Sequence, residues 1–289
     1  MIGTLPGARA NIFAHGCAPI QVSYLGYPGT LGAPYIDYII ADKMVIPPDR
    51  RSDFTEKVVY LPRSYQVNDS KRKISERVFT KRELGLPESG FVFCCFNNNY
   101  KIHPATFHGW MKILKAVDGS VLCLLEDNAT AAMNLRSHAH DAGVETSRLV
   151  FAKRMKLDEH LARHSLADLF LDTLACNAHT TASDALWAGL PVLTCLGKAF
   201  AGRVAGSLLR AIELPELITH TQADYEARAI ELATHPDKLH EIKSKLQKNR
   251  MTTPLFNGKL FALHIESAYA SMFARHQAGL PPEHIEVNP

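Results

Sequence analysis

Residues 91–96 read Phe-Val-Phe-Cys-Cys-Phe, an apolar run that contains no polar side chain. Such a run, without alternation, is typical of a strand buried on both faces of a parallel sheet. The next stretch, residues 103–117, has helical spacing of its apolar side chains, at Phe107, Trp110, Met111, Leu114 and Val117. Pro104 suits the first turn of that helix. A buried strand followed at once by a helix predicts the βα unit of an α/β sheet.

The same alternation continues along the chain. We expect further strands at residues 121–125, 149–152, 169–171 and 191–194. We expect the helices that follow them at residues 129–142, 157–164, 180–188 and 201–212. Parallel strands joined through helices of this length make right-handed connections, so the pattern predicts a Rossmann-like, doubly wound parallel sheet. The remainder is expected to be helical, at residues 223–233, 236–250 and 260–277.

The first part of the chain shows short strands separated by turns. Strand candidates rich in β-branched and aromatic side chains stand at residues 20–25, 36–40 and 57–61. Gly26-Tyr27-Pro28-Gly29-Thr30 is a strong turn signal. The basic run Lys71-Arg72-Lys73 lies in a polar stretch and is expected to be a solvated linker. The chain is therefore divided into residues 1–70 and residues 71–289.

The bulk composition excludes several classes of protein. The 289 residues are 46% hydrophobic and 21% charged, which is typical of a soluble globular protein. A net charge of +3 without a dense basic run gives no reason to expect a nucleic acid partner. No apolar stretch reaches the roughly 18–20 residues that cross a bilayer, so we expect no membrane partner. The six cysteines form no Cys-x-x-Cys pair, which favours reduced thiols and a cytoplasmic location.

Two loops stand where an open parallel sheet binds its ligands, at the carboxyl ends of the strands. The first follows the strand at residues 91–96 and reads Asn97-Asn98-Asn99-Tyr100-Lys101. Its amides and its lysine can donate several hydrogen bonds to an anion. The alternative interpretation is a polar loop whose amides cap the next helix.

The second loop runs from Asp172 to Thr181 and leads into the helix expected from Thr180. A helix start offers backbone N–H groups without partners and the positive end of the dipole, which together favour phosphate. His179 can add a further donor there. The alternative interpretation is ordinary capping of the helix beside a surface histidine.

Together the two loops indicate a diphosphate site. A nucleoside diphosphate gains negative charge as its bond to a sugar breaks, and Lys101, His179 and the helix start would stabilise that charge. No loop carries an Asp-x-Asp pair, so we expect no metal ion and no cofactor apart from the donor substrate. The dinucleotide motif Gly-x-Gly-x-x-Gly and the P-loop motif are both absent from the sequence.

At these residues the sequence resembles the catalytic region of the protein O-GlcNAc transferases, including their bacterial relatives and the plant SPINDLY-type enzymes. The resemblance extends from about Gly7 to the end of the chain. Its most specific pieces keep their order: Ala18-Pro19-Ile20-Gln21-Val22, Leu25 to Thr30, Asp37-Tyr38-Ile39-Ile40, Phe96-Asn97, Tyr100-Lys101-Ile102, Asp172-Thr173, Cys176-Asn177, His179-Thr180-Thr181, Asp184, Leu186 to Gly189, Pro191, and Pro254-Leu255-Phe256-Asn257.

The resemblance implies a GT-B fold, in which two Rossmann-like lobes have the active site between them. It implies UDP-GlcNAc as the donor, Ser or Thr of a protein as the acceptor, and an inverting displacement without a metal. Residues 1–70 are too short for a doubly wound lobe, so we expect a partial N-terminal lobe and a complete C-terminal lobe. The family's catalytic histidines and tetratricopeptide repeats lie upstream of the matching region, so the chain is expected to be a fragment.

The resemblance also implies a role for each matching residue. Lys101 is expected to contact the diphosphate and assist the leaving group. His179, Thr180 and Thr181 are expected to bind the phosphates, the threonines chiefly through backbone N–H groups. Asp184 is expected to bind sugar or ribose hydroxyls, and His160 and Arg163 are expected near the uridine. Gly26 and Pro28 are expected beside the sugar. Asn98 stands where the animal enzymes have Gln and is expected to donate as well. Leu157 stands where they have a Lys near the ribose.

Three other functions stay open at this point. The chain could be an inactive fragment that binds a nucleotide sugar without transferring it. It could be a protein O-fucosyltransferase that uses GDP-fucose, although the run from His179 to Thr181 is more similar to the GlcNAc enzymes. A GT-B enzyme for a lipid or a small glycan would need an acceptor groove that the sequence does not indicate.

Overall fold

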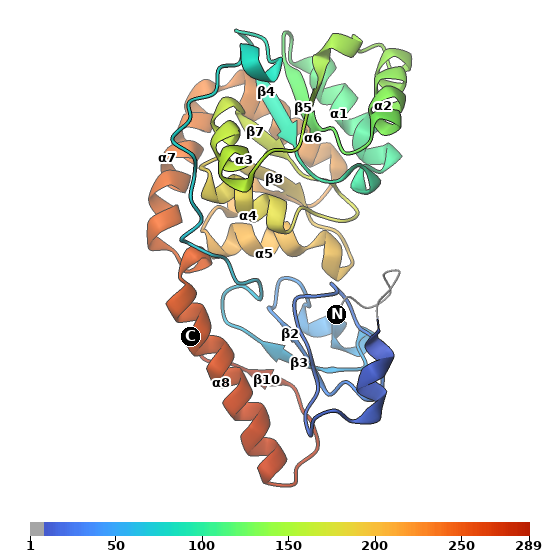
Figure 1. The fold of residues 1–289 in the computed structure, drawn as a ribbon, viewed down its shortest axis with the longest axis vertical. Helices are drawn as coiled ribbons and strands as arrows, with labels where there is room; N and C mark the ends of the chain where they lie inside the picture. The colour runs from blue at the N-terminus through green and yellow to red at the C-terminus, as the bar shows by residue number, and fades with distance from the viewer. Residues whose placement is uncertain (1–8) are drawn as a thin grey trace.

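Two parallel β-sheets form the framework of the protein, one above the other along its long axis (Figure 1). The computed structural model describes residues 9–289, so the start of the resemblance at Gly7 lies outside the described residues. The larger sheet has the strand order β6-β5-β4-β7-β8-β9, and the smaller sheet has the order β1-β2-β3-β10. Neighbouring strands are parallel in both sheets. The expected α/β class is confirmed.

The larger sheet is doubly wound. Its strands are β4 (Val92–Cys95), β5 (Val121–Leu125), β6 (Leu149–Ala152), β7 (Leu169–Leu171), β8 (Val192–Cys195) and β9 (Ile218–Thr219). The chain runs outward from β4 through β5 to β6, and then returns to the other side of β4 for β7, β8 and β9. The reversal lies between β4 and β7, which are direct neighbours. Such a switch point opens a crevice at the carboxyl ends of its two strands.

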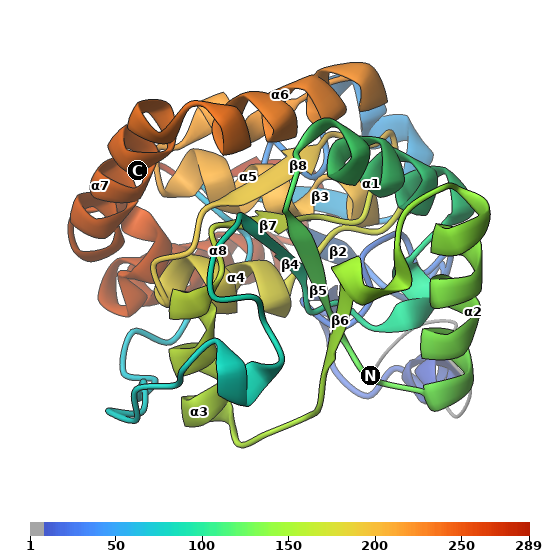
Figure 2. The ribbon, with the colours of Figure 1, turned by 90° about the horizontal axis from the view of Figure 1, so that it is seen from above.

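Helices cover both faces of this sheet, as Figure 2 shows from above. On one face lie α1 (Pro104–Ala116), α2 (Ala129–Asp141) and α6 (Gln222–Thr234). On the other face lie α3 (Leu157–Arg163), α4 (Thr180–Trp187) and α5 (Val204–Ala211). Phe93, Trp110 and Phe170 are fully buried between the layers. Burial on both faces explains why the run at residues 91–96 is continuously apolar.

The smaller sheet is built from both ends of the chain. Its strands are β1 (Val22–Ser23), β2 (Tyr38–Ala41), β3 (Lys57–Tyr60) and β10 (Ile285–Glu286). α7 (Pro236–Thr252) packs on the larger unit, and α8 (Gly258–Gln277) then crosses to the smaller sheet (Figure 1). Ala268 and Met272 of α8 are buried against the apolar side chains of β2 and β3.

The end of the chain therefore differs from the expected division at residue 70. α8 and β10 pack on the first part of the chain, although both belong to the stretch 71–289 that we assigned to the second part. The physical reason is the apolar face of β2 and β3, whose burial needs the cover of a helix. No sequence pattern indicates β10, because a strand of two residues is too short to show alternation.

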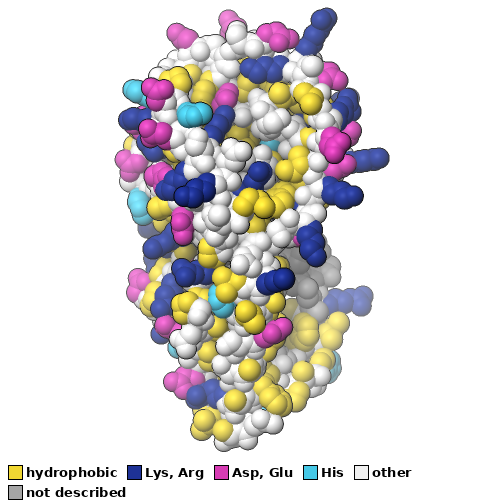
Figure 3. Space-filling model, turned by 90° about the vertical axis from the view of Figure 1, so that its left-hand side faces the viewer, with side chains coloured by type: hydrophobic (Ala, Val, Ile, Leu, Met, Phe, Trp, Pro, Cys, Tyr) yellow, Lys and Arg dark blue, Asp and Glu magenta, His cyan; other side chains and the backbone are white. Residues whose placement is uncertain are grey.

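The surface is polar over the larger unit and more apolar along α8. Figure 3 shows the side of the molecule that lies on the left in Figure 1. Basic and acidic side chains are intermixed over its upper part, and apolar side chains gather below. The exposed apolar side chains of α8 include Leu263, Tyr269 and Phe273. Among the described residues, no helix combines the length and the apolar character needed to cross a bilayer.

A buried carboxylate joins the two units. Asp42, which follows β2, accepts hydrogen bonds from the backbone N–H of Tyr65 at 2.9 Å and from the hydroxyl of Ser207 on α5 at 2.6 Å. Nearby, Nε of Arg203 donates to the carbonyl oxygen of Met44 at 2.6 Å. Buried polar groups with partners of this kind fix the geometry of an interface. These hydrogen bonds connect the smaller unit to the larger one.

The linker is not solvated throughout, which corrects the expectation drawn from its charge. Lys71 and Lys73 are exposed, but the side chain of Arg72 is only 13% exposed and forms an ion pair with Asp184 of α4. The indole N–H of Trp187 also donates to the carbonyl oxygen of Arg72 at 3.0 Å. An oppositely charged partner more than 100 residues away in the sequence cannot be inferred from local charge.

Candidate functional site

Lys101 and the start of α4 meet at the switch point of the larger sheet. Lys101 ends a short 3-10 helix (Asn99–Lys101) that follows β4. Its Nζ donates to the carbonyl oxygen of Asn177 at 2.7 Å, and α4 begins shortly afterwards, at Thr180. The structure thus brings the two loops singled out in the sequence to one corner of the molecule.

The N-terminus of α4 is open to a ligand. Its N-cap residue, His179, makes no side-chain capping bond. Within residues 9–289 the backbone N–H groups of Thr180 and Thr181 have no acceptor, and Thr180 is exposed. Free N–H groups at the positive end of a helix, beside the Lys101 amine, form a site that attracts phosphate.

Asp172, the first residue after β7, organises the loop between Lys101 and α4. Its Oδ1 accepts hydrogen bonds from the N–H groups of Thr173 at 2.8 Å and Ala178 at 2.6 Å, and its Oδ2 accepts one from the Thr194 hydroxyl at 2.6 Å. Burial raises the pKa of Asp172 to about 7, although these hydrogen bonds and Lys101 act in the opposite direction. Asp172 was not among the predicted site residues. Its position directly after a buried strand was the available signal.

Asn97 links the two loops. Its Nδ2 donates to Oγ1 of Thr173 at 2.8 Å, and its Oδ1 accepts a hydrogen bond from the Thr181 hydroxyl. Asn97 is buried at the end of β4. Because the Thr181 hydroxyl is engaged in this way, the backbone N–H is the donor that Thr181 has left for a phosphate. Asn97 was not among the predicted site residues.

His179 lies in the same corner, but its ring is already engaged. Its Nε2 lies 3.1 Å from the carbonyl oxygen of Ala201, so the ring donates there. Burial and the neighbouring Lys101 lower the pKa of His179 to about 4, which leaves the ring neutral at pH 7. Only Nδ1 remains, and in this tautomer it accepts a hydrogen bond rather than donating one. The ring would have to be protonated, or turned, to donate to a phosphate.

The turn from the smaller sheet borders this corner. Gly26 and Pro28 line a small cavity of about 40 Å³ together with His179 and Phe200. Leu25, directly before the turn, has a positive φ of 59°, which is uncommon for a residue other than glycine. The structure therefore places both predicted turn residues next to His179.

α3 supplies an aromatic and cationic cluster around Phe96. The His160 ring lies 5.2 Å from the Phe96 ring and 4.7 Å from the His164 ring. Arg163 is buried, its guanidinium stacks on Phe96 at 4.4 Å, and its Nη1 donates to the carbonyl oxygen of Lys153 at 2.7 Å. The contacts of Arg163 are thus with the protein itself, and the less buried His160 is the one available to a ligand.

Asn98 lies apart from these contacts, among polar groups of the protein. Its Oδ1 accepts a hydrogen bond from Nη2 of Arg154 at 3.2 Å, and its Nδ2 lies 3.4 Å from the Tyr100 hydroxyl. Arg154 also pairs with Asp127 at 2.6 Å. Arg154 was not predicted, because nothing in its local sequence distinguishes it from other exposed basic residues.

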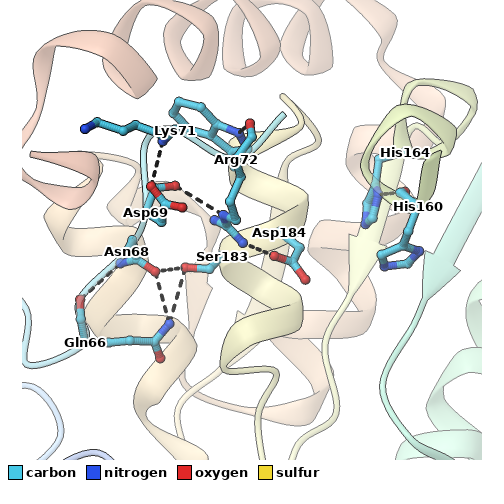
Figure 4. Close-up of polar contacts among 10 residues, drawn as sticks. Gln66, Asn68, Asp69, Lys71, Arg72, His160, His164, Ser183 and Asp184 are labelled. Carbon is cyan, nitrogen blue, oxygen red and sulfur yellow. Dashed lines mark hydrogen bonds and ion pairs between the residues drawn. The ribbon is translucent and has the colours of Figure 1, made fainter. Parts of the chain in front are cut away.

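Asp184 stands one turn beyond Thr180 on α4. Figure 4 shows its carboxylate between Arg72 on one side and His160 and His164 on the other. Burial raises the pKa of Asp184, and Arg72 lowers it again. The resemblance assigned this carboxylate to a ligand hydroxyl, and the structure adds an ion pair with Arg72.

The buried histidines give the protein a testable sensitivity to acid. Burial lowers the pKa of His160 to about 3 and that of His164 to about 4, and His179 behaves similarly. The unfolded chain, with histidine pKa values near ~6.5, binds these protons first. These three histidines therefore contribute stability above about pH 6.5 that is lost as the pH falls, by up to ~4 kcal/mol per pH unit for three protons. Asp172, whose folded pKa is about 7, takes up a proton in the folded state over the same range and offsets about one of these protons.

Urea unfolding at pH 7.0, 6.0 and 5.0 measures this slope. In the variant His164→Gln, we expect the slope to fall by about 1.4 kcal/mol per pH unit, because one such proton is removed. The matched control is His138→Gln, since His138 is exposed on α2. An equal slope in His164→Gln and the wild type would contradict the buried neutral state of His164.

Among residues 9–289, no three His, Cys, Asp or Glu side chains come together in a group that could hold a metal ion. The groups of positive charge at the switch point are Lys101 and the start of α4, and the carboxyl of Asp172 is bonded within the loop between them.

Comparison with known proteins gives the family. The model of glycosyl transferase family 41 matches residues 1–78 and 73–265. A protein of Arabidopsis thaliana, named as a probable UDP-N-acetylglucosamine–peptide N-acetylglucosaminyltransferase SEC, is 41% identical over 99% of this chain. A SPINDLY protein of Oryza sativa, named as a probable enzyme of the same activity, is 33% identical over 92% of this chain. The chain spans only 30% and 29% of these two relatives.

Solved structures agree with this result. An O-GlcNAc transferase of Thermobaculum terrenum, a K341M mutant, has a TM-score of 0.78 and 30% sequence identity, over 90% of this chain and 49% of its own. Sucrose-phosphate synthase of Thermosynechococcus elongatus has a TM-score of 0.59 at 17% identity over 83% of this chain and 59% of its own, which shows the fold alone. The expected GT-B type is therefore confirmed. The chain belongs to glycosyl transferase family 41.

Proposed function

We propose that this chain is the donor-binding part of an enzyme that transfers N-acetylglucosamine from UDP-GlcNAc to Ser or Thr hydroxyls of proteins. The names of the relatives that match nearly the whole chain support the donor and the type of acceptor. One observation in the structure carries the proposal. The Lys101 amine contacts the backbone just before α4, so a cation and an open helix N-terminus share one corner of the sheet.

This corner suits the charge that develops when UDP leaves. Breaking the bond between the sugar and the β-phosphate places negative charge on the phosphate oxygens. Donors that are fixed in advance stabilise such charge best in a site that largely excludes water. Lys101 contributes a full charge, and the Thr180 and Thr181 amides contribute the helix dipole. We propose an inverting displacement in which these groups neutralise the diphosphate without a metal ion.

The remaining predicted residues are proposed to position the donor. His160 faces the uridine, and Asp184 accepts hydrogen bonds from hydroxyls. Gly26 and Pro28 close the sugar side, because they line the same cavity as His179. Asn98 and Arg163 hold the loop and the aromatic cluster through the contacts described above. The six free thiols support a cytoplasmic location, and the acceptors are proposed to be proteins of that compartment.

Calorimetry on this chain tests the donor assignment. We expect UDP and UDP-GlcNAc to bind, and GDP to bind at least about tenfold more weakly, because the base lies against the His160 cluster. Preference for GDP would favour the fucosyltransferase alternative. Binding of UDP by this chain, without transfer to an acceptor peptide, would show that the chain alone is a binding unit. The absence of any nucleotide binding would contradict the proposal.

Thr181 offers a second test. In Thr181→Pro we expect the UDP affinity to fall about tenfold, because the substitution removes one backbone donor to the phosphates. The matched control is Thr181→Val, which removes the hydroxyl bonded to Asn97 but keeps the N–H. Equal UDP affinities of the two variants in calorimetry would show that the amide does not contact the phosphate.

A further inference from the structure

Arg72 reaches from the linker into the larger unit and is held there at several points. Its guanidinium pairs with Asp184, its Nε donates to the carbonyl oxygen of Asp69 at 3.2 Å, and its own carbonyl oxygen accepts from Trp187 at 3.0 Å. Figure 4 shows the side chain lying along α4. A long side chain fixed at both its backbone and its head group loses little further freedom when the site is occupied.

The neighbouring linker residues are fixed as firmly. Asn68 Oδ1 accepts a hydrogen bond from the hydroxyl of Ser183, which precedes Asp184 on α4. Nε2 of Gln66 donates to the same hydroxyl at 3.3 Å, and Asn68 donates to the carbonyl oxygen of Leu255 at 3.3 Å. All three polar side chains are buried. Arg72 therefore follows closely after a segment whose polar side chains are bonded to α4 and to the backbone of Leu255.

The ion pair engages one nitrogen of the Arg72 guanidinium and one oxygen of the Asp184 carboxylate. Arg72 Nη1 contacts Oδ1 of Asp184, whereas within residues 9–289 the Oδ2 atom has no hydrogen-bond donor. Nη2 of Arg72 is buried and has no partner either. A carboxylate–guanidinium pair that served stability alone would gain from the bidentate arrangement. Figure 4 shows the second oxygen turned away from Arg72, toward the side on which His160 lies.

The position of this oxygen relates it to the phosphate corner. Asp184 is four residues after Thr180, so both lie on the same face of α4, about 6 Å apart along its axis. A ribose between a diphosphate at the helix start and a base at His160 would place its hydroxyls near this face. An ionised carboxylate accepts hydrogen bonds from both hydroxyls of a vicinal diol.

We propose that Arg72 is a positioning residue for donor recognition: it holds the Asp184 carboxylate so that the second oxygen accepts hydrogen bonds from the ribose hydroxyls. The inference rests on the proposed donor function and adds the linker to the binding site. Arg72 also favours the ionised form of Asp184, since burial raises the pKa of this carboxyl and Arg72 is the charged group that opposes the rise. Across from it, His160 of α3 and His164, which directly follows α3, stay neutral near pH 7.

Calorimetry with two probes, UDP and 2′,3′-dideoxy-UDP, tests the role of Arg72. In Arg72→Met we expect UDP to bind about tenfold more weakly than to the wild type, while the dideoxy probe binds equally to both. Arg72→Lys is expected to restore most of the UDP affinity, because it returns the cation. Lys71→Met is the matched control, since Lys71 is the exposed neighbour in the linker, and it should behave as the wild type.

The outcomes separate this inference from the function it rests on. If the wild type binds no UDP, the proposed function fails. If the wild type binds UDP but Arg72→Met loses affinity for both probes alike, or gains affinity for UDP, the positioning role of Arg72 is wrong. A loss seen with UDP-GlcNAc and not with UDP would move the contact to the transferred sugar and overturn the ribose assignment. Should Arg72→Met fail to fold, Arg72→Lys compared with Asp184→Asn supplies the same comparison between probes.

Discussion

Replacing Lys101 with methionine is expected to weaken the binding of UDP to this chain about 30-fold and to lower the rate of sugar transfer by about 10³-fold. Hydrogen bonds to a charged group contribute roughly 1.5–3 kcal/mol, which accounts for the loss of affinity. The larger effect on the rate follows because the charge on the leaving diphosphate grows in the transition state. Methionine keeps an unbranched side chain that is only one atom shorter, and it removes the charge and the donors.

Two variants serve as controls for Lys101→Met. Lys115→Met changes an exposed lysine of α1 and should leave UDP affinity unchanged. Lys101→Arg keeps the charge and is expected to retain part of the UDP affinity. We expect Lys101→Met to keep the fold, because the side chain of Lys101 is half-buried and makes a single hydrogen bond, to the carbonyl oxygen of Asn177. The loss of UDP affinity must therefore be seen in a folded variant. A full transfer rate in Lys101→Met would remove Lys101 from the chemistry.

Replacing Asp172 with alanine is expected to destabilise the protein by about 4 kcal/mol or more. The carboxylate receives hydrogen bonds from Thr173, Ala178 and Thr194 in a fully buried position. Each buried donor left without an acceptor costs roughly 1–3 kcal/mol. Asp172→Asn keeps one acceptor oxygen, so we expect about half of the loss. Urea unfolding followed by circular dichroism measures both variants.

The matched control for Asp172 is Asp141→Ala. Asp141 is exposed at the end of α2, and a substitution there should change the free energy of unfolding by less than about 0.5 kcal/mol. If Asp172→Ala were as stable as this control, the loop before α4 would not depend on the carboxylate. Another contact would then have to hold this loop in place at the N-terminus of α4.

Much of the larger unit could be predicted because its signals are local. The strand at residues 91–96 and the helix after it were evident from apolar spacing, and the structure has β4 at Val92–Cys95 and α1 at Pro104–Ala116. The proximity of Lys101 to the start of α4 followed from topology, since parallel strands next to a switch point end at the same edge. Each of these inferences needed only neighbours in the sequence and one general rule of sheet winding.

The features that escaped prediction depend on contacts between distant segments. Arg72 lies in a polar, basic stretch of sequence, which predicted a solvated side chain. Its partner Asp184 lies on a helix far along the chain. His179 was expected to donate to a phosphate, but its Nε2–H donates to the carbonyl oxygen of Ala201 instead. The return of α8 and β10 to the smaller sheet follows from the need to bury an apolar face. No pattern within the last 30 residues indicates which face that is.

The most direct test is a crystal structure of this chain with UDP bound. We expect a β-phosphate oxygen within about 3 Å of Lys101 Nζ and of a backbone N–H at Thr180 or Thr181, with the Asn177 carbonyl losing its bond to the lysine or sharing it. UDP bound at another edge of the sheet, or with its phosphates in solvent while Lys101 stays on Asn177, would contradict the assignment of this corner as the diphosphate site.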